Sequence, residues 1–133
     1  MNKAIGVFIA SLFSLSIGTA ALAESGTVNW HSGLQETLVV VTVAEGHMQG
    51  TGKATGITYN DAGSGSLHEG AANCFYSFHL TDGVGEGQGY CTWSDADGDR
   101  IFTKFDGMFG VPEGNNGTNY ITGGTGKYVG ITG

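Results

Sequence analysis

The sequence predicts an all-β protein, an antiparallel β-barrel of about eight short strands. Three observations support this fold class. Short runs rich in β-branched and aromatic residues alternate with polar ones, turns rich in glycine separate these runs, and no run after residue 23 has the period of an amphipathic helix. A barrel is favoured over an open sheet because closure removes the unpaired edges of short strands.

The first 23 residues have the pattern of a secretory signal peptide. Lys3 precedes an apolar run over residues 4–21, and Ala21-Leu22-Ala23 matches an A-x-A cleavage site. Cleavage would leave residues 24–133, the length of one ordinary domain. We therefore expect a single β-barrel domain that is secreted or periplasmic and carries no membrane segment once the signal is removed.

The charge of the chain narrows the range of partners. The formal net charge is −7 at pH 7, and the basic residues do not cluster. An acidic chain of this kind is a poor match for nucleic acid or anionic membranes. We expect neither as a partner, and no sequence motif calls for a cofactor.

Three strands are expected before the centre of the chain. Residues 27–31 are predicted as the first strand, anchored by Trp30, and the β-branched run over residues 37–44 as the second. Residues 45–56 mix glycine with polar side chains and receive no assignment up to Gly56, where the alternating segment 56–60 begins. A turn over residues 61–66 follows.

A hairpin centred on Asp82-Gly83 organises the rest of the chain. An Asp-Gly pair between alternating runs is typical of a type I′ turn, which requires positive φ at both central residues. Counting outward from this turn places Cys74 opposite Cys91 in a non-hydrogen-bonded pair, where Cα atoms come closest. We predict a Cys74–Cys91 disulfide, which suits an exported chain; two buried free thiols are the alternative.

The same register divides the side chains between two faces. A second turn at Ala96-Asp97-Gly98, with Gly98 in the left-handed region, places Trp93 opposite Ile101. The predicted inner face carries Cys74, Tyr76, Phe78, Leu80, Cys91, Trp93, Ile101 and Phe105. The predicted outer face carries Phe75, His79, Glu86, Gln88, Tyr90, Arg100, Phe102 and Lys104.

The last strands are expected at residues 118–122 and 127–132, separated by a glycine-rich turn. The chain stops at Gly133, within what reads as a strand. We therefore expect the sequence to be truncated at this end.

Two glycine-containing segments carry a family resemblance. Residues 122–133 (T-G-G-T-G-K-Y-V-G-I-T-G) resemble the glycine-rich strand-turn-strand of the allene oxide cyclase-like and dirigent-like barrels, and residues 89–102 are similar to small exported bacterial members of that group. The resemblance implies an eight-stranded antiparallel barrel with a mostly apolar lumen. No position here matches a catalytic carboxylate of the plant cyclases, so the resemblance assigns no catalytic residue.

Three aspartates at alternate positions, Asp95, Asp97 and Asp99, suggest a weak calcium site. The glycine falls at the fourth position of this loop rather than the sixth, and no glutamate provides bidentate ligation. A tight hairpin turn accounts for the same residues without a metal. The four histidines have no spacing typical of zinc ligands.

The aromatic inner face is the best candidate for contact with a ligand. The candidates are Tyr76, Phe78, Trp93, Ile101 and Phe105. They could line a lumen that holds a small apolar molecule, or they could simply fill a narrow barrel. We expect a non-enzymatic binding or structural module. The alternative is an isomerase or cyclase acting on a hydrophobic molecule, which would need an ionisable group inside, with Glu36, Glu45 and Glu69 as candidates.

Overall fold

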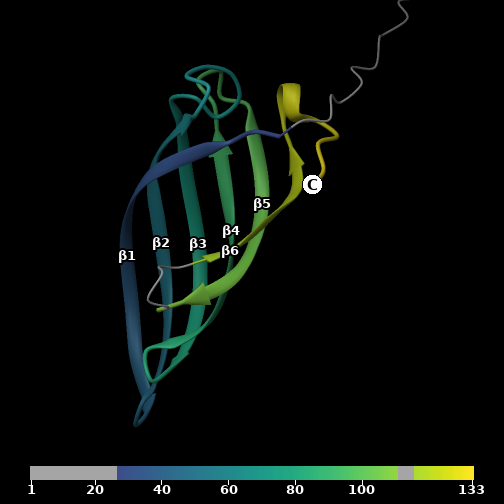
Figure 1. The fold of residues 1–133 in the computed structure, drawn as a ribbon. Helices are drawn as coiled ribbons and strands as arrows, with labels where there is room; N and C mark the ends of the chain where they lie inside the picture. Colours follow the sequence, from purple (N-terminus) through teal and green to yellow (C-terminus); the bar gives the residue numbers. More distant parts are fainter. Residues whose placement is uncertain (1–26, 111–115) are drawn as a thin grey trace, which may run out of the picture.

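A computed structural model describes residues 27–110 and 116–133 of the chain, as one antiparallel sheet of six strands (Figure 1). The strands are β1 (Trp30–Ala44), β2 (His47–Asn60), β3 (Gly70–Thr81), β4 (Val84–Ser94), β5 (Arg100–Phe109) and β6 (Asn116–Gly124), followed by a short 3₁₀ helix, η1 (Gly126–Tyr128). The all-β antiparallel fold is confirmed. The predicted signal peptide lies outside the described residues.

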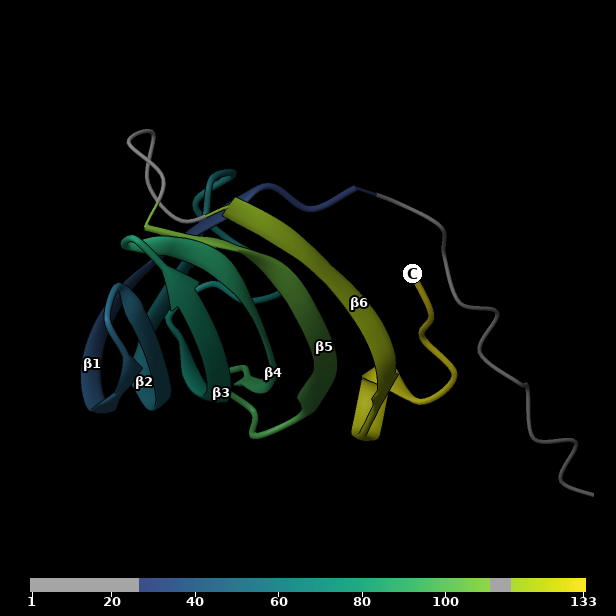
Figure 2. The ribbon, with the colours of Figure 1, turned by 90° about the horizontal axis from the view of Figure 1, so that it is seen from below.

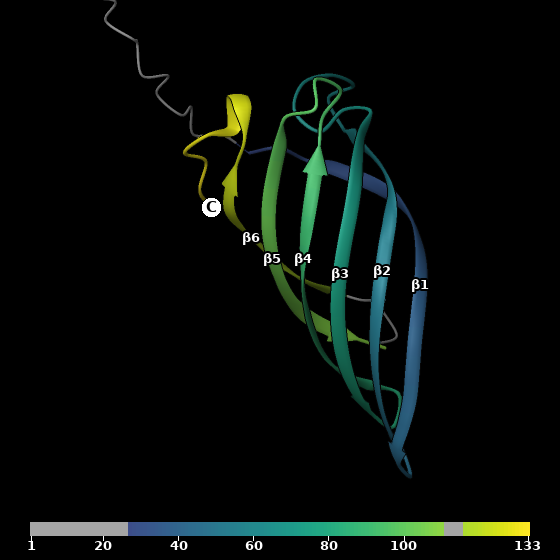
Figure 3. The ribbon, with the colours of Figure 1, turned by 180° about the vertical axis from the view of Figure 1, so that it is seen from behind.

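The sheet curves strongly but does not close. Each strand pairs with its neighbour in chain order from β1 to β6, and within the described ranges β1 and β6 are not paired with each other. Figure 2 shows the sheet bent around a concave side, and Figure 3 shows its convex back. The prediction of a closed barrel with about eight strands is not confirmed.

Two predicted strands merge into the single long strand β1. It pairs with β2 from Trp30–Asn60 to Ala44–His47, with one irregularity near its end. Segment 47–55, which received no assignment, is the first part of β2. Its Gly50 and Gly52 lie beneath aromatic rings of β3, and a Cβ at either position would overlap a ring. Glycine therefore serves packing here, which residue-by-residue strand propensity does not register.

The central hairpin has the predicted register. Asp82 and Gly83 both have positive φ (50° and 85°), as a type I′ turn requires. β3 and β4 pair from Thr81–Val84 outward to Cys74–Cys91 and beyond. The two cysteines form the predicted disulfide, which is compatible with an oxidising compartment.

The next connection is also as predicted. Gly98 has φ 86°, and the backbone N–H of Asp95 donates to the Asp99 carbonyl across the turn. β4 and β5 then pair Trp93 with Ile101 and Cys91 with Thr103. The division into inner and outer side chains follows from this register.

The predicted strand over residues 127–132 is wrong. Gly126 has φ 53°, and the N–H groups of Tyr128 and Val129 donate to carbonyls three residues earlier, which forms η1. Tyr128 is buried against the core. The segment turns away from the sheet because its side chains find partners at the β4–β5 turn, as described below.

Candidate functional site

The concave face gathers the side chains predicted to line a lumen. The five candidates Tyr76, Phe78, Trp93, Ile101 and Phe105 all point to this side, because they occupy the inner alternate positions of β3, β4 and β5. The first four expose only 4% to 8% of their surface, and Phe105 is half-buried. Their common face is therefore as predicted, and ligand contact by them stays a prediction.

Glycines make room for these rings. The Phe78 ring lies over Gly50 of the neighbouring strand, and the Tyr76 ring lies over Gly52. Phe109 of β5 completes the cluster, with its ring centroid 5.7 Å from that of Tyr76 and 5.8 Å from that of Phe78. Large side chains laid over bare backbone allow tight packing on a strongly curved face.

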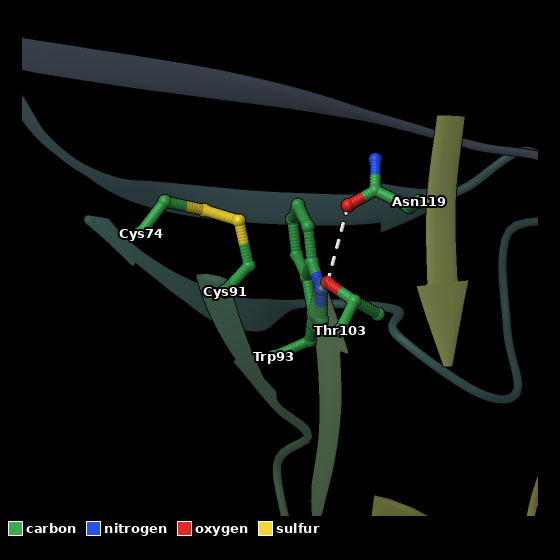
Figure 4. Close-up of a disulfide and its surroundings, with 5 residues drawn as sticks. All are labelled: Cys74, Cys91, Trp93, Thr103 and Asn119. Atoms are coloured by element: carbon green, nitrogen blue, oxygen red, sulfur yellow. Dashed lines mark hydrogen bonds between the residues drawn. A yellow bond between two sulfur atoms is a disulfide. The ribbon is translucent and has the colours of Figure 1, made fainter. Parts of the chain in front are cut away.

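A hydrogen-bonded tryptophan, Trp93, covers the concave face near the end of β4. The Trp93 indole N–H donates to Thr103 Oγ1 at 2.9 Å, and the Thr103 hydroxyl donates to Asn119 Oδ1 at 3.1 Å (Figure 4). Trp30 packs edge-on against Trp93, with centroids 4.4 Å apart. Figure 1 shows why: the start of β1 crosses the concave side of the sheet. Trp93 thus contacts the start of β1 across the concave side of the sheet.

A hollow of about 290 Å³ remains on the concave face, lined by three of the five candidates, Tyr76, Trp93 and Phe105, but not by Phe78 or Ile101. It lies near the lower limit of small-molecule sites, which span about 300–1,000 Å³. Its lining comes from β1 to β6 and consists of Trp30, Ser32, Leu34, Glu36, Ala54, Cys74, Tyr76, Cys91, Trp93, Phe105, Phe109, Gly117 and Asn119. Five aromatic rings and the disulfide make its walls predominantly apolar.

Glu36 is the only charged side chain among the described residues that line the hollow. Burial raises the pKa of the Tyr76 hydroxyl to about 12, and the charge of Glu36 and a hydrogen bond to it act in the same direction. Tyr76 therefore stays protonated at neutral pH and can donate to the carboxylate. The hollow combines apolar walls with one anionic acceptor.

The sequence names Glu36 as one of three candidate carboxylates but does not single it out for this site. The turns at Asp82-Gly83 and Gly98 fix the register of the three central strands, whereas the sequence predicts no turn that would fix the register of β1. The alternation of Leu34, Glu36 and Leu38, all paired with inner positions of β2, was the available signal. All three candidate carboxylates, Glu36, Glu45 and Glu69, are exposed, and of the three only Glu36 lines the hollow.

The three aspartates of the suggested calcium site bind the chain itself. Lys127 Nζ lies 2.5 Å from Asp95 Oδ2 and 2.8 Å from Asp97 Oδ2, and the Lys127 backbone N–H donates to Asp99 Oδ2 at 3.1 Å. Asp95 Oδ1 accepts the backbone N–H groups of Asp97 and Asp99. In the part of the chain described, no three histidine, cysteine or acidic side chains are grouped to hold a metal. The cluster is a tether between the β4–β5 turn and η1.

A second, larger hollow of about 610 Å³ lies on the convex face. It is lined by exposed Val39, Phe75 and Tyr90, and Lys53 Nζ lies 5.5 Å from the centroid of the Phe75 ring. Side chains of only β1 to β4 bound it, and they stand on one surface of the sheet. The concave hollow is lined by residues of all six strands, so it is the better candidate despite its smaller volume.

Comparison with known proteins identifies no relative: no family model, no curated protein and no solved structure matches the chain. The resemblance to allene oxide cyclase-like barrels consequently stays a prediction. No helix within residues 27–110 or 116–133 combines the length and the apolar character that crossing a membrane would require.

Proposed function

We propose that the protein is a small exported binding module that holds an apolar small molecule against the concave face of its sheet. The observation that carries this proposal is the hollow of about 290 Å³, walled by aromatic rings from both halves of the sheet. Apolar concave sites with few polar groups are the usual form of small-molecule sites.

The proposal includes export and a barrel-like enclosure. The disulfide, the N-terminal signal pattern and the acidic composition all suit an exported protein. The curvature of the sheet and the contact of Trp30 with Trp93 bring β1 over β4, which supports a lumen in the manner of the allene oxide cyclase-like barrels.

The size of the hollow limits the affinity. Apolar burial contributes about 25 cal/mol per Å², so a ligand that buries roughly 300 Å² gains about 7.5 kcal/mol before the cost of association. We therefore expect dissociation constants in the micromolar range or weaker.

The test is a titration with the uncharged fluorescent dye N-phenyl-1-naphthylamine. We expect saturable binding to the wild type and strong loss of binding in Leu34→Trp, because a larger ring at this half-exposed position fills the hollow. Val39→Trp is the matched control, since Val39 lies on the same strand and faces the convex side. Loss of binding in Val39→Trp alone would place the site on the convex face and contradict the proposal.

A second candidate function is isomerisation or cyclisation of a hydrophobic molecule. It is favoured by one observation, the Glu36 carboxylate beside the protonated Tyr76 hydroxyl in the hollow, since such a pair could exchange a proton with a bound molecule. Turnover of a ligand found by the dye assay, lost in Glu36→Gln while binding persists, would support this function. Unchanged ligand after prolonged incubation would leave the binding module as the function.

A further inference from the structure

We propose that the hollow selects apolar molecules whose head group donates hydrogen bonds, such as alcohols and protonated amines, and discriminates against carboxylates. This inference rests on the proposed function and adds the class of ligand. Its basis is the position of Glu36 at the hollow, with no cation of the described residues beside it.

The neighbours of Glu36 leave space for a head group. Glu36 pairs across the strands with Ala54, a small side chain that is only 2% exposed. Tyr76 reaches from β3 across Gly52 as far as the side chain of Leu38 on β1. The hydroxyl of Tyr76 thus comes to the same end of the hollow as the carboxylate, and the remaining lone pairs of Glu36 can accept from a ligand.

The basic side chains of the described residues lie elsewhere. Lys53 and Lys104 follow the inner residues of their strands by one position and so stand on the convex side. Arg100 likewise precedes the inner residue Ile101, and Lys127 is held by Asp95 and Asp97. A carboxylate in the hollow would therefore meet the charge of Glu36 without a compensating cation, in a chain of net charge −7.

The other polar groups of the lining do not reverse this preference. Asn119 Oδ1 accepts the Thr103 hydroxyl, which leaves the Asn119 amide N–H groups and the Ser32 hydroxyl as neutral partners. Neutral donors can bind either kind of head group, whereas Glu36 repels only the anionic one. The sign of the preference follows from charge.

The experiment compares 1-octanol, octylamine and octanoate, which share one apolar tail, as competitors of N-phenyl-1-naphthylamine at low ionic strength. For the wild type we expect octanol and octylamine to displace the dye at concentrations at least about tenfold below those needed with octanoate. Added salt should reduce the difference for octylamine more than for octanol.

Two variants with the same change in net charge sharpen the comparison. Glu36→Gln should bring the three competitors to within about threefold of one another, whereas Glu45→Gln, in the β1–β2 turn outside the hollow, should keep the wild-type order. Near-ultraviolet circular dichroism confirms that both variants are folded.

The possible failures are distinguishable. If octanoate displaces the dye as well as octylamine does from the wild type, or if Glu45→Gln shifts the order as much as Glu36→Gln, the head-group inference is overturned and the binding module stands. If neither the dye nor any competitor binds the wild type, the proposed function itself is overturned, and the inference falls with it.

Discussion

The β3–β4 hairpin and strand β1 belong to the same sheet but have opposite surroundings. β3 alternates strictly between buried and exposed positions from Gly70 to His79. β1 is exposed along most of its length, on the concave side (Leu38 48%) as well as the convex side (Val41 58%). The hairpin has neighbours on both edges, whereas β1 pairs only with β2 within the described residues. The alternation of a strand sets which face a side chain takes, and neighbouring strands decide how deeply it is buried.

The largest effect that tests this comparison is expected from Trp93→Ala. Trp93 is 4% exposed, packs against Trp30 and donates to Thr103, so its loss leaves a cavity and should lower the free energy of unfolding by about 3–5 kcal/mol. Leu38→Ala in half-exposed β1 should cost less than about 1.5 kcal/mol. Urea denaturation followed by fluorescence and circular dichroism measures both. Equal losses would mean that β1 is covered in solution.

The next largest effect is expected from the disulfide, which fixes the hairpin and has no counterpart in β1. The double variant Cys74→Ala/Cys91→Ala removes a crosslink between residues 17 apart and should cost about 2–4 kcal/mol. Urea denaturation of this variant against the oxidised wild type gives the difference. Thiol titration of the denatured, unreduced protein provides the check, because two free thiols would contradict the pairing.

Two glycine-to-alanine changes compare a tightly packed glycine with one in an open part of β1. A Cβ at Gly52 would overlap the Tyr76 ring and crowd Leu38, so Gly52→Ala should destabilise by about 1–3 kcal/mol. No atom lies within 4 Å of a Cβ at Gly33 in β1, so Gly33→Ala should be neutral or stabilise by up to about 1 kcal/mol. Thermal unfolding midpoints would show opposite or unequal shifts, and a large loss in Gly33→Ala would argue against this packing.

The smallest effect concerns the tether between η1 and the β4–β5 turn, and it depends on pH. Burial of the Asp95 carboxyl would raise its pKa, but Lys127, Tyr128 and the Asp97 N–H outweigh burial and lower the pKa below its usual value. The stabilisation by Asp95 is therefore present above the unfolded pKa of about 3.9 and is lost as the pH falls through the lower folded pKa.

The variant Asp95→Asn tests this dependence. Its thermal midpoint should lie below that of the wild type at neutral pH, and the gap should narrow in strong acid, where Asp95 is protonated in both states. Asp82→Asn, at the exposed turn of the other hairpin, is the matched control. A gap that does not change with pH would contradict a role for the charge of Asp95.

The central hairpin could be predicted because its determinants are local. Asp82-Gly83 and Gly98 fix the turns, and the register of three strands then follows by counting. Cys74 opposite Cys91 and the inner position of Trp93 are consequences of that count.

The remaining features depend on contacts between distant segments. Gly50 belongs to a strand because Phe78 covers it, and residues 127–132 leave the sheet because Lys127 meets Asp95 and Asp97 about thirty positions earlier in the chain. The strand propensities of single residues carry no information about either contact. The sequence alone does not single out Glu36 from Glu45 and Glu69 for the same reason, since β1 acquires its register only by pairing with β2.

The contact between Trp30 and Trp93 gives the protein an intrinsic spectroscopic probe. These are the only two tryptophans of the chain, and both line the hollow. Indoles this close couple electronically, so a circular dichroism couplet reports whether the start of β1 stays seated on β4. A guest molecule entering beside them would change their emission, and occupancy could be followed without any label.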